Sequence, residues 1–399
     1  DIHALRARLA GGLGITLAQV EVCCEHLSRG DADTHLVDAA AAAAARLSRE
    51  ASAPVRLLVD RDDRLAGAGI LPGVSGSVKV AAARDGKLSS IRVRARVFPG
   101  AAGEDPGTDT PFLYGCGHYR VERIPLRANV PDAVVSWSAG AGFLVECALD
   151  ELAASLGMDP VELRKANEPD ALRRQAYDLG AERITWVRRN PTAGAGAGVT
   201  RRGMGVAACV RRDPAAPGAV ASLTLHSDGS VELRCSVGDA APGARTTLAT
   251  VVAEELGIEP RGVAVTLGRT SLGPGPAGPG GLSLSSAVAP VKQAAADARA
   301  RLLALLAPVL DVAPAELGAA GGKIYVRANP ECSLTWKQAC IRVPAEGICG
   351  VGRWADGIAG GEAAGVHFAE VEVDLETGRV AVPRLVAVYD CGVVLDALA

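Results

Sequence analysis

The stretch HFAEVEVDLETGRVAVPRLVAVYDCG, residues 367–392, indicates the fold class more clearly than any other part of the chain. Apolar and polar residues alternate on both sides of Glu376-Thr377-Gly378, which is typical of two half-buried strands joined by a tight turn. This alternation puts four valines on one face of the two strands, namely Val371, Val373, Val380 and Val382. The segment therefore predicts an antiparallel hairpin.

The composition is that of a globular chain. Its 399 residues, 49% of them hydrophobic, are enough for one large core or for several domains. A formal net charge of −3 and an aromatic content of 3% argue against a nucleic-acid partner. The longest apolar candidate, residues 36–47, is an alanine tract interrupted by Asp38 and Arg46, so no membrane span is predicted. The 10 cysteines include no CxxC pair, which favours reduced thiols and a cytoplasmic location over a disulfide framework or a protein-ligated metal site.

A repeated pattern divides the chain. Residues 5–22 (LRARLAGGLGITLAQVEV) and 248–265 (LATVVAEELGIEPRGVAV) each read as an amphipathic helix ending at Leu-Gly-Ile, a short connection and Val-x-Val. Gly14 and Gly257 stand where a helix needs a left-handed residue at its end. We therefore predict two related halves. Their borders are a first domain over 1–188, a Gly/Ala-rich linker over 189–202 and a second domain over 203–399.

The remaining patterns mix helices with strands. Helices are predicted over 36–51, 142–157 and 286–308, strands over 55–60, 118–127 and 203–210, and hairpins around Arg84–Lys87 and Ser227–Ser230. Asp159 and Pro160 should begin a further helix, as its cap and first residue. Several of the strands lie in hairpins, so the fold class is predicted as α+β or mixed α/β, with packed helices, and not as a regular parallel barrel.

Two loops have the composition of anion-binding segments. Residues 273–286 (GPGPAGPGGLSLSS) precede a long helix, whose N-terminus carries about half a positive charge. The hydroxyls available there are those of Ser283, Ser285 and Ser286. Residues 237–247 (VGDAAPGARTT) lead into the repeated helix, with Thr246 or Thr247 as its expected cap. No Gly-Lys-Ser/Thr follows, so neither loop is a Walker loop, and a solvent loop with a serine cap is the alternative.

These segments, taken in order, resemble the molybdopterin-binding subunit of the molybdenum hydroxylases, the xanthine dehydrogenase and aldehyde oxidase family. The hairpin with Asp-Cys-Gly at 390–392 is similar to a signature of that family. Residues 142–170 (GFLVECALDELAASLGMDPVELRKANEPD) resemble its helix pair, and residues 117–131 resemble the strand before it. Residues 55–67 are similar to a further family segment. The resemblance implies two mixed-sheet domains of the kind that bind molybdopterin in xanthine dehydrogenase.

The resemblance also implies which residues contact the cofactor. The family's strand-to-helix loop reads Gly-Thr-Gln-Asp/Glu-x-Gly-x-Gly, and the residues that keep part of it are Gly238, Asp239, Gly243 and Thr246. The next family loop, of the Gly-Gly-Ser type, is matched by Gly280, Gly281, Ser283, Ser285 and Ser286. A Gly-Gly-Gly-Phe-Gly-Gly-Lys run stands in family members where this chain has residues 25–35, and only Gly30 is kept.

The chain departs from the family around the implied cofactor. Residues 25–35 read EHLSRGDADTH, and Asp31 and Asp33 would lie unfavourably close to an anionic group. The family's arginine-bearing turn before the 142–157 helix and the glutamine of its second-half loop are both absent.

The catalytic group is not assigned. The family's glutamate base stands in a Gly-Glu-Pro context beyond the Asp-Cys-Gly signature, which the resemblance places past Ala399. Glu370 and Glu372 are expected on the solvent face of the hairpin and not as substitutes. Asp1 already lies inside a helical pattern, and Ala399 precedes the Gly-Glu-Pro context, so the chain is expected to be incomplete at both ends.

The resemblance implies an oxidoreductase that hydroxylates an aldehyde or an N-heterocycle with water as the oxygen source. Its cofactor would be molybdenum-molybdopterin, with the cytosine dinucleotide form as one option. Iron–sulfur clusters and FAD would reside on an iron–sulfur subunit and an FAD subunit, since the chain has no iron–sulfur cysteine pattern. Two alternatives stay open: a catalytically inactive scaffold that has lost cofactor binding, and an independent anion- or nucleotide-binding module built on residues 273–286.

Overall fold

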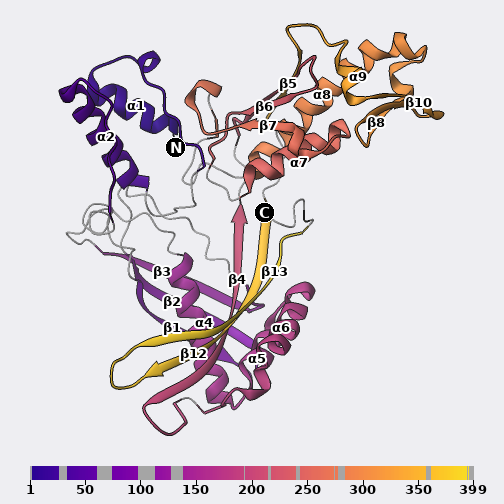
Figure 1. Ribbon diagram of the computed structural model, residues 1–399. Coiled ribbons are helices and arrows are strands. Elements are labelled where there is room, and N and C mark those ends of the chain that lie inside the picture. Colours follow the sequence, from indigo (N-terminus) through magenta and orange to yellow (C-terminus); the bar gives the residue numbers. More distant parts are fainter. Residues whose placement is uncertain are drawn as a thin grey trace.

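The computed structural model is a mixed assembly of helices and sheets in which long strands connect two groups of elements (Figure 1). It describes residues 2–26, 34–60, 74–97, 113–126, 138–192, 194–213, 217–239, 243–273, 275–276, 284–355, 361–392 and 394. The predicted α+β class is confirmed. Among the helices of these residues, none has the length and apolar character needed to cross a membrane.

The lower group in Figure 1 contains two three-stranded sheets and three helices. The first sheet has the order β1-β2-β3, with β1 antiparallel and β3 parallel to β2, and comprises β1 (Val74–Ala82), β2 (Leu88–Val97) and β3 (His118–Pro125). The second sheet is antiparallel, with the order β13-β12-β4, and comprises β4 (Thr200–Asp213), β12 (Gly361–Asp374) and β13 (Val380–Asp390). Their helices are α4 (Ser138–Leu156), α5 (Pro160–Asn167) and α6 (Ala171–Ile184). Helix α4 packs on the first sheet and α6 on the second.

The upper right group is built around a four-stranded sheet of order β11-β5-β6-β7. Its strands are β5 (Val220–Leu225), β6 (Val231–Cys235), β7 (Val263–Thr266) and β11 (Ile348–Arg353). Helices α7 (Ala244–Leu256) and α8 (Leu284–Leu310) pack against each other, and α8 covers β5 and β11. A small sheet of β8 (Leu317–Ala320), β9 (Lys323–Val326) and β10 (Asn329–Thr335) adjoins α9 (Trp336–Cys340). At the upper left, α1 (Ile2–Leu13) packs against α2 (Thr34–Ala51).

Most of the predicted local elements are present. The helix stops of the repeat are confirmed, because Gly14 and Gly257 both have left-handed backbones, with φ of +69° and +68°. The Asp159 carboxylate accepts a hydrogen bond from the amide of Val161 at 2.7 Å, as expected of a cap before Pro160. The predicted strand over 55–60 is wrong: these residues belong to neither helix nor strand and are mostly exposed, and no described strand pairs with their backbone.

The hairpin at 367–392 is confirmed as β12 and β13. Val373 pairs with Val380, and Gly378 closes the turn with φ of +70°. The buried face, however, is the opposite one: Val366 and Phe368 have no exposed surface, whereas Val380 is 60% exposed.

The predicted solvent exposure of Glu370 and Glu372 is therefore wrong. Both lie on the same face of β12 as Phe368, which is the face that packs against α6. Only 17% of the Glu370 side chain is exposed. Alternation along a strand shows that two faces differ, but it does not show which face receives the helix.

The second sheet joins early and late parts of the chain. Strand β4 begins at Thr200, inside the segment 189–202, and pairs along its whole length with β12. Helix α6, from before that segment, packs on β12 and β13, from after it. The predicted domain borders stay a prediction, and the contacts of the second sheet run across them.

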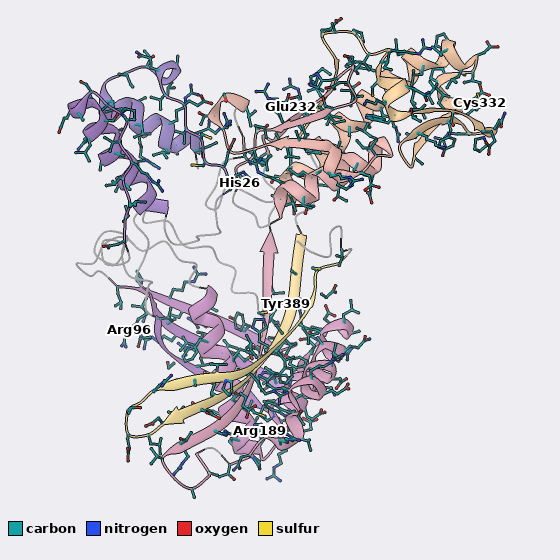
Figure 2. The ribbon with its side chains drawn as sticks, in the orientation of Figure 1. His26, Arg96, Arg189, Glu232, Cys332 and Tyr389 are labelled. Carbon is teal, nitrogen blue, oxygen red and sulfur yellow. The ribbon has the colours of Figure 1, made fainter. Side chains whose placement is uncertain are left out.

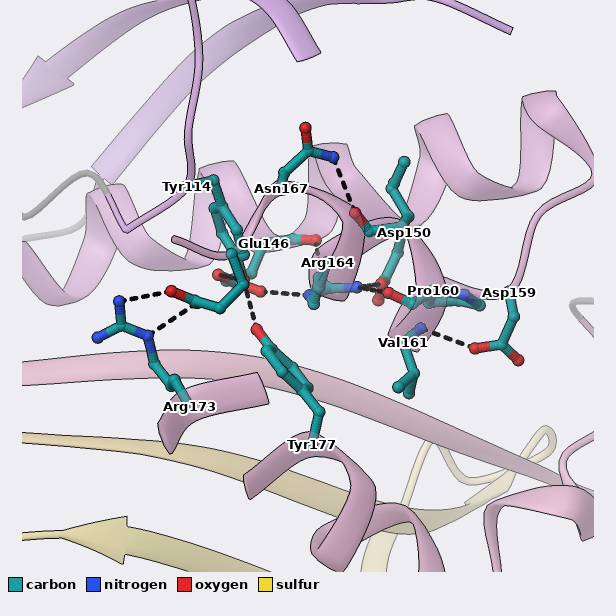
Figure 3. Close-up of polar contacts among 12 residues, drawn as sticks. Tyr114, Glu146, Asp150, Asp159, Pro160, Val161, Arg164, Asn167, Arg173 and Tyr177 are labelled. Carbon is teal, nitrogen blue, oxygen red and sulfur yellow. Dashed lines mark hydrogen bonds and ion pairs between the residues drawn. The ribbon is translucent and has the colours of Figure 1, made fainter. Parts of the chain in front are cut away.

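A network of buried charged and phenolic groups holds the lower helices together (Figure 3). Arg164 of α5 has a completely buried side chain, and its Nε and Nη1 atoms lie 2.9 Å and 2.7 Å from carboxylate oxygens of Glu146 and Asp150 on α4. Tyr114 donates to Glu146 at 2.8 Å, and its oxygen is 3.0 Å from that of Tyr177 on α6. One guanidinium thus links α4 to α5, and two phenols extend the link to α6.

Burial disfavours the charged forms of the groups in this network. Burial raises the pKa of the Glu146 carboxyl, and the attraction of Arg164 opposes that effect. Burial likewise opposes the charge of Arg164, but the phenolic and carboxyl groups around it raise its pKa, so the guanidinium stays charged. A buried charge that loses its partner is strongly destabilising, so the members of this network depend on one another.

We expect Arg164→Met to lower the free energy of unfolding by about 3–5 kcal/mol at about pH 8, because it leaves the Glu146 carboxylate buried and unpaired. The loss should be smaller at about pH 5. A carboxyl whose pKa is raised in the folded state stabilises the fold below its unfolded pKa and loses that contribution as pH rises through the folded value.

Guanidinium unfolding at both pH values checks this. Lys165→Met is the matched control: the partners of Lys165, Glu162 and Asp178, are mostly exposed, so it should cost less than about 1 kcal/mol. Equal losses at Arg164 and Lys165 would contradict the assigned role.

Close packing of α6 on β12 generates a second prediction. A Cβ atom at Gly180 would lie 2.3 Å from Cε2 of the buried Phe368 ring. Gly180→Ala should therefore lower the unfolding free energy by about 1–3 kcal/mol. Gly142→Ala in α4 is the control: nothing lies within 4 Å of its Cβ position, and it should stabilise by about 0.5–1 kcal/mol. Thermal and denaturant unfolding measure both, and an unchanged Gly180→Ala variant would refute the contact.

Candidate functional site

Two segments that are far apart in the sequence meet at the carboxylate of Asp239. This residue follows β6 and is almost completely buried. Its Oδ2 accepts hydrogen bonds from the backbone amide of His26 at 2.5 Å and from Nε of Arg245 at 2.9 Å. His26, labelled in Figure 2, belongs to the segment after α1. Arg245 belongs to the first turn of α7. Asp239 thereby ties the first repeat to the second.

Backbone contacts continue the same junction. The amide of Cys24 donates to the carbonyl of Gly268 at 2.8 Å, and that of Thr270 donates to the carbonyl of Val22 at 3.0 Å. Gly268 has φ of +73°, and a Cβ atom there would lie 2.2 Å from the Cys24 carbonyl oxygen, so only glycine allows this approach. Cys23, the residue after the Val-x-Val of the first repeat, forms an isolated antiparallel bridge with Arg269.

Helix α7 begins without a side-chain cap. Its cap residue is Gly243, in the left-handed conformation, and the helix starts at Ala244. The prediction that Thr246 or Thr247 caps this helix is wrong, because both lie inside its first turn; Thr246 is exposed and Thr247 is buried. The first amides of a helix have no partner within the helix, so the N-terminus of α7 retains hydrogen-bond donors for an anion.

Arg245 adds a cation beside these donors. Its Nε bonds Asp239 and its Nη1 bonds the carbonyl of Val265. The remaining Nη2 atom is buried and has no hydrogen-bond partner within the described part of the chain. An unpaired buried N–H costs about 1–3 kcal/mol, so a bound acceptor would stabilise this corner.

Two described acidic groups here, Glu25 and Asp239, are neutralised locally, whereas Asp31 and Asp33 lie outside the described residues. Nε of Arg269 lies 2.5 Å from Oε1 of Glu25, and this hydrogen bond lowers the pKa of the Glu25 carboxyl. Asp239 is paired with Arg245 in the same way. Neither carboxylate therefore presents an uncompensated charge to an anionic ligand.

The structure brings several predicted site residues together. Gly238 and Asp239 directly precede the loop into α7, and Gly243 and Thr246 lie at the start of that helix. The second glycine-rich segment is adjacent, because a Cβ atom at Gly275 would lie 1.9 Å from the carbonyl oxygen of Ser236.

The other predicted residues divide into two groups. Ser285 and Ser286 lie in the first turn of α8, the former half-buried and the latter completely buried. Gly30, Gly280, Gly281 and Ser283 lie outside the described residues. Reasoning from the sequence missed His26, whose contribution is a backbone amide, and Arg245. The signal for Arg245 was its position in the first turn of a helix that begins with glycine.

The Arg164 network is not a second site. Burial and neighbouring charges shift the pKa values of Arg164, Tyr114 and Tyr177, which often marks a functional site, but the guanidinium of Arg164 has no exposed surface. Nor does any group of three or more His, Cys, Asp or Glu residues in the described ranges lie close enough to hold a metal ion.

Comparison with known proteins shows the family to which the chain is similar over most of its length. Residues 2–168 and 179–399 each match a family model described as a molybdopterin cofactor-binding domain. The aldehyde oxidoreductase molybdenum-binding subunit of Escherichia coli (strain K12) is 27% identical over 411 residues, covering 98% of this chain and 55% of that protein. The carbon monoxide dehydrogenase large chain of Afipia carboxidovorans is 24% identical over 398 residues, covering 85% and 49%.

Solved structures share the fold. Quinoline 2-oxidoreductase from Pseudomonas putida 86 superposes with a TM-score of 0.81 at 20% identity, over 100% of this chain and 57% of that chain. CO dehydrogenase from Oligotropha carboxidovorans gives 0.79 at 20% identity, over 98% and 56%. The chain spans about half the length of the curated relatives it matches. It belongs to the molybdopterin-binding large subunits of the molybdenum hydroxylase family, with one cofactor-binding domain in each half.

Proposed function

We propose that the chain binds molybdenum-molybdopterin at the junction around Asp239. It would form the cofactor-binding part of an oxidoreductase that hydroxylates an aldehyde or an N-heterocycle with water as the oxygen source. The observation that carries this proposal is the meeting of loops from both family domains beside the uncapped α7 N-terminus. There Arg245 has a buried N–H without a partner among the described residues. When bound, the cofactor supplies two-electron oxidation of the substrate carbon.

The chain's own residues suit an anionic ligand. The amides at the start of α7 and the guanidinium of Arg245 would bind its negative charge. We propose Gly238, Gly243 and Thr246 as further contacts from this loop. Of the two described serines of α8, Ser285 is the better placed to donate, because Ser286 is completely buried. Gly30, Gly280, Gly281 and Ser283 stay proposals from the sequence.

Asp239 would act by positioning and not by contact with the cofactor. Its oxygen holds the segment before residues 27–33 against α7 and orients Arg245. Asp239 would thereby keep the guanidinium of Arg245 in one orientation. It would also keep the segment that ends at His26 at a fixed distance from α7.

Partner subunits are part of the proposal. The relatives' names describe a molybdenum-binding subunit and a large chain, which implies further subunits in those enzymes. We propose an iron–sulfur subunit and an FAD subunit as electron acceptors for this chain, the cytosine dinucleotide form as the cofactor variant, and the cytoplasm as the location. All ten cysteines are free thiols, as a reducing compartment would keep them.

A catalytically inactive scaffold is the competing function. It is favoured by residues 25–35, which retain one glycine, and by the position of Glu370, which faces α6 and not an open site. The two functions differ in one measurable property, the retention of the cofactor.

The test is metal and pterin content of the chain purified from cells that make the cofactor. We expect about one molybdenum atom per chain, with a matching fluorescent pterin after oxidation. Arg245→Ala should reduce both. Arg261→Ala, an exposed position in the turn after α7, should leave both unchanged. A folded chain without molybdenum or pterin would favour the scaffold.

Asp239→Ala should loosen the junction in the cofactor-free chain. It removes two hydrogen bonds and leaves Arg245 unpaired, at a cost of about 1.5–3 kcal/mol. Hydrogen–deuterium exchange should accelerate at residues 22–26. Asp228→Ala, which removes a carboxylate that bonds only its own turn, should leave that segment unchanged. Unaltered exchange at 22–26 in the Asp239 variant would rule out the positioning role.

A further inference from the structure

The first sheet, β1-β2-β3, has one covered face and one charged face. Ile91, Val93 and Ala95 of β2 point toward α4 and are almost fully buried. The residues between and after them, Arg92, Arg94 and Arg96, point to the opposite side and are exposed. Arg96 is labelled on the outer side of the lower group in Figure 2. The sheet therefore presents a row of guanidinium groups away from its core.

Strand register concentrates these charges. Lys79 of β1 is the partner of Arg92, and Arg92 is the partner of Arg120 on β3, so three cations lie side by side across the sheet. In the next row, Arg94 is flanked by Ser77 and Glu122. Like charges placed directly opposite each other destabilise a sheet, so this arrangement has a cost that an anionic partner would remove.

Among the residues that the structure describes, carboxylates do not balance this face. Glu122 lies 3.3 Å from Arg92 and 3.4 Å from Arg94, in ion pairs whose arginine side chains are 51% and 58% exposed. Lys79, Arg96 and Arg120 make no ion pair with any residue that the structure describes. Five cations thus surround one carboxylate, on a chain whose net charge is −3.

We propose that this basic face, formed by Lys79, Arg92, Arg94, Arg96 and Arg120 around Glu122, docks an acidic surface of a partner protein. The arginine fork matches carboxylates in two parallel hydrogen bonds, and the pleated sheet holds the forks at fixed spacing. The inference does not depend on cofactor binding, so it can fail while the proposed function stands.

The same face is poorly suited to other polyanions. No aromatic residue occupies the rows of the basic face, so it offers no platform for stacked bases. Glu122 would repel a run of phosphates, whereas on a protein surface it can accept from a lysine or an amide. Ser75 and Ser77, the β1 partners of Arg96 and Arg94, are small and polar. Ile124, the β3 partner of Arg96, is apolar but half-buried, so these rows offer little exposed apolar surface for insertion into a membrane.

Fluorescence anisotropy with the full chain tests the proposal. The probe is a labelled Glu/Asp-rich peptide of about 16 residues, titrated at about 50 mM and about 300 mM NaCl. We expect saturable binding that weakens with salt. The triple variant R92Q/R96Q/R120Q should bind at least about 10-fold more weakly. The control R261Q/K292Q/K323Q removes the same charge from exposed positions in the upper group and should bind within about twofold of the original chain.

Two further titrations distinguish an acidic protein from a nucleic acid or a membrane as the partner. A single-stranded oligonucleotide and vesicles containing phosphatidylserine are each titrated against the same variants. Stronger binding of either through the basic face would overturn the assignment to an acidic protein. Equal peptide binding by the patch and control variants would overturn the docking surface itself. Single Arg120→Gln serves if the triple variant fails to fold; it should raise the melting temperature by relieving the opposed charges and should weaken peptide binding.

Discussion

The buried guanidinium of Arg164 is the interaction on which the lower half of the molecule depends. It has no contact with solvent, so Glu146 and Asp150 on the neighbouring helix must supply its counter-charge. Their spacing on α4 and the entry of α5 through the Asp159 cap place the three groups together. Because Glu146 also accepts from Tyr114, and Tyr114 meets Tyr177, the position of α6 follows from the same charge.

Helix α6 in turn decides how the late strands pack. Gly180 lets the helix approach Phe368 closely, and this contact selects the buried face of the β12–β13 hairpin. The long strands β4, β12 and β13 then extend from the lower group toward the upper one (Figure 1). At the other end, Asp239 binds the backbone amide of His26, 213 residues away in the chain, and so joins the segment after the first repeat to the loop before the second. The candidate cofactor site is thus a product of long-range contacts at both ends of the molecule.

Family membership accounts for the fold that the chain shares with its solved relatives, and a few residues of the loop into α7 build the candidate site. The loop into α7 keeps Gly238, Asp239 and Gly243 but begins its helix without a hydroxyl cap. Arg245 pairs with Asp239, and its Nη2 atom, which has no partner in the described ranges, is where we propose that an acceptor binds. Charge is distributed unevenly beyond this site as well: the first sheet gathers cations on its open face, although the chain as a whole is acidic.

Local physical chemistry allowed much of this to be predicted from the amino-acid sequence. Gly14, Gly257 and Gly378 occupy left-handed positions, Asp159 caps its helix, and the hairpins form where their turn residues stand, because each of these depends on a few neighbouring residues. The buried face of the hairpin, the missing strand at 55–60 and the first residue of α7 did not follow from those patterns. They depend on which distant surface packs against a segment, as α6 does against Phe368. The same is true of the pairing of His26 with Asp239 and of Arg92 with Lys79 and Arg120: register and chain crossing, not residue type, bring those groups together.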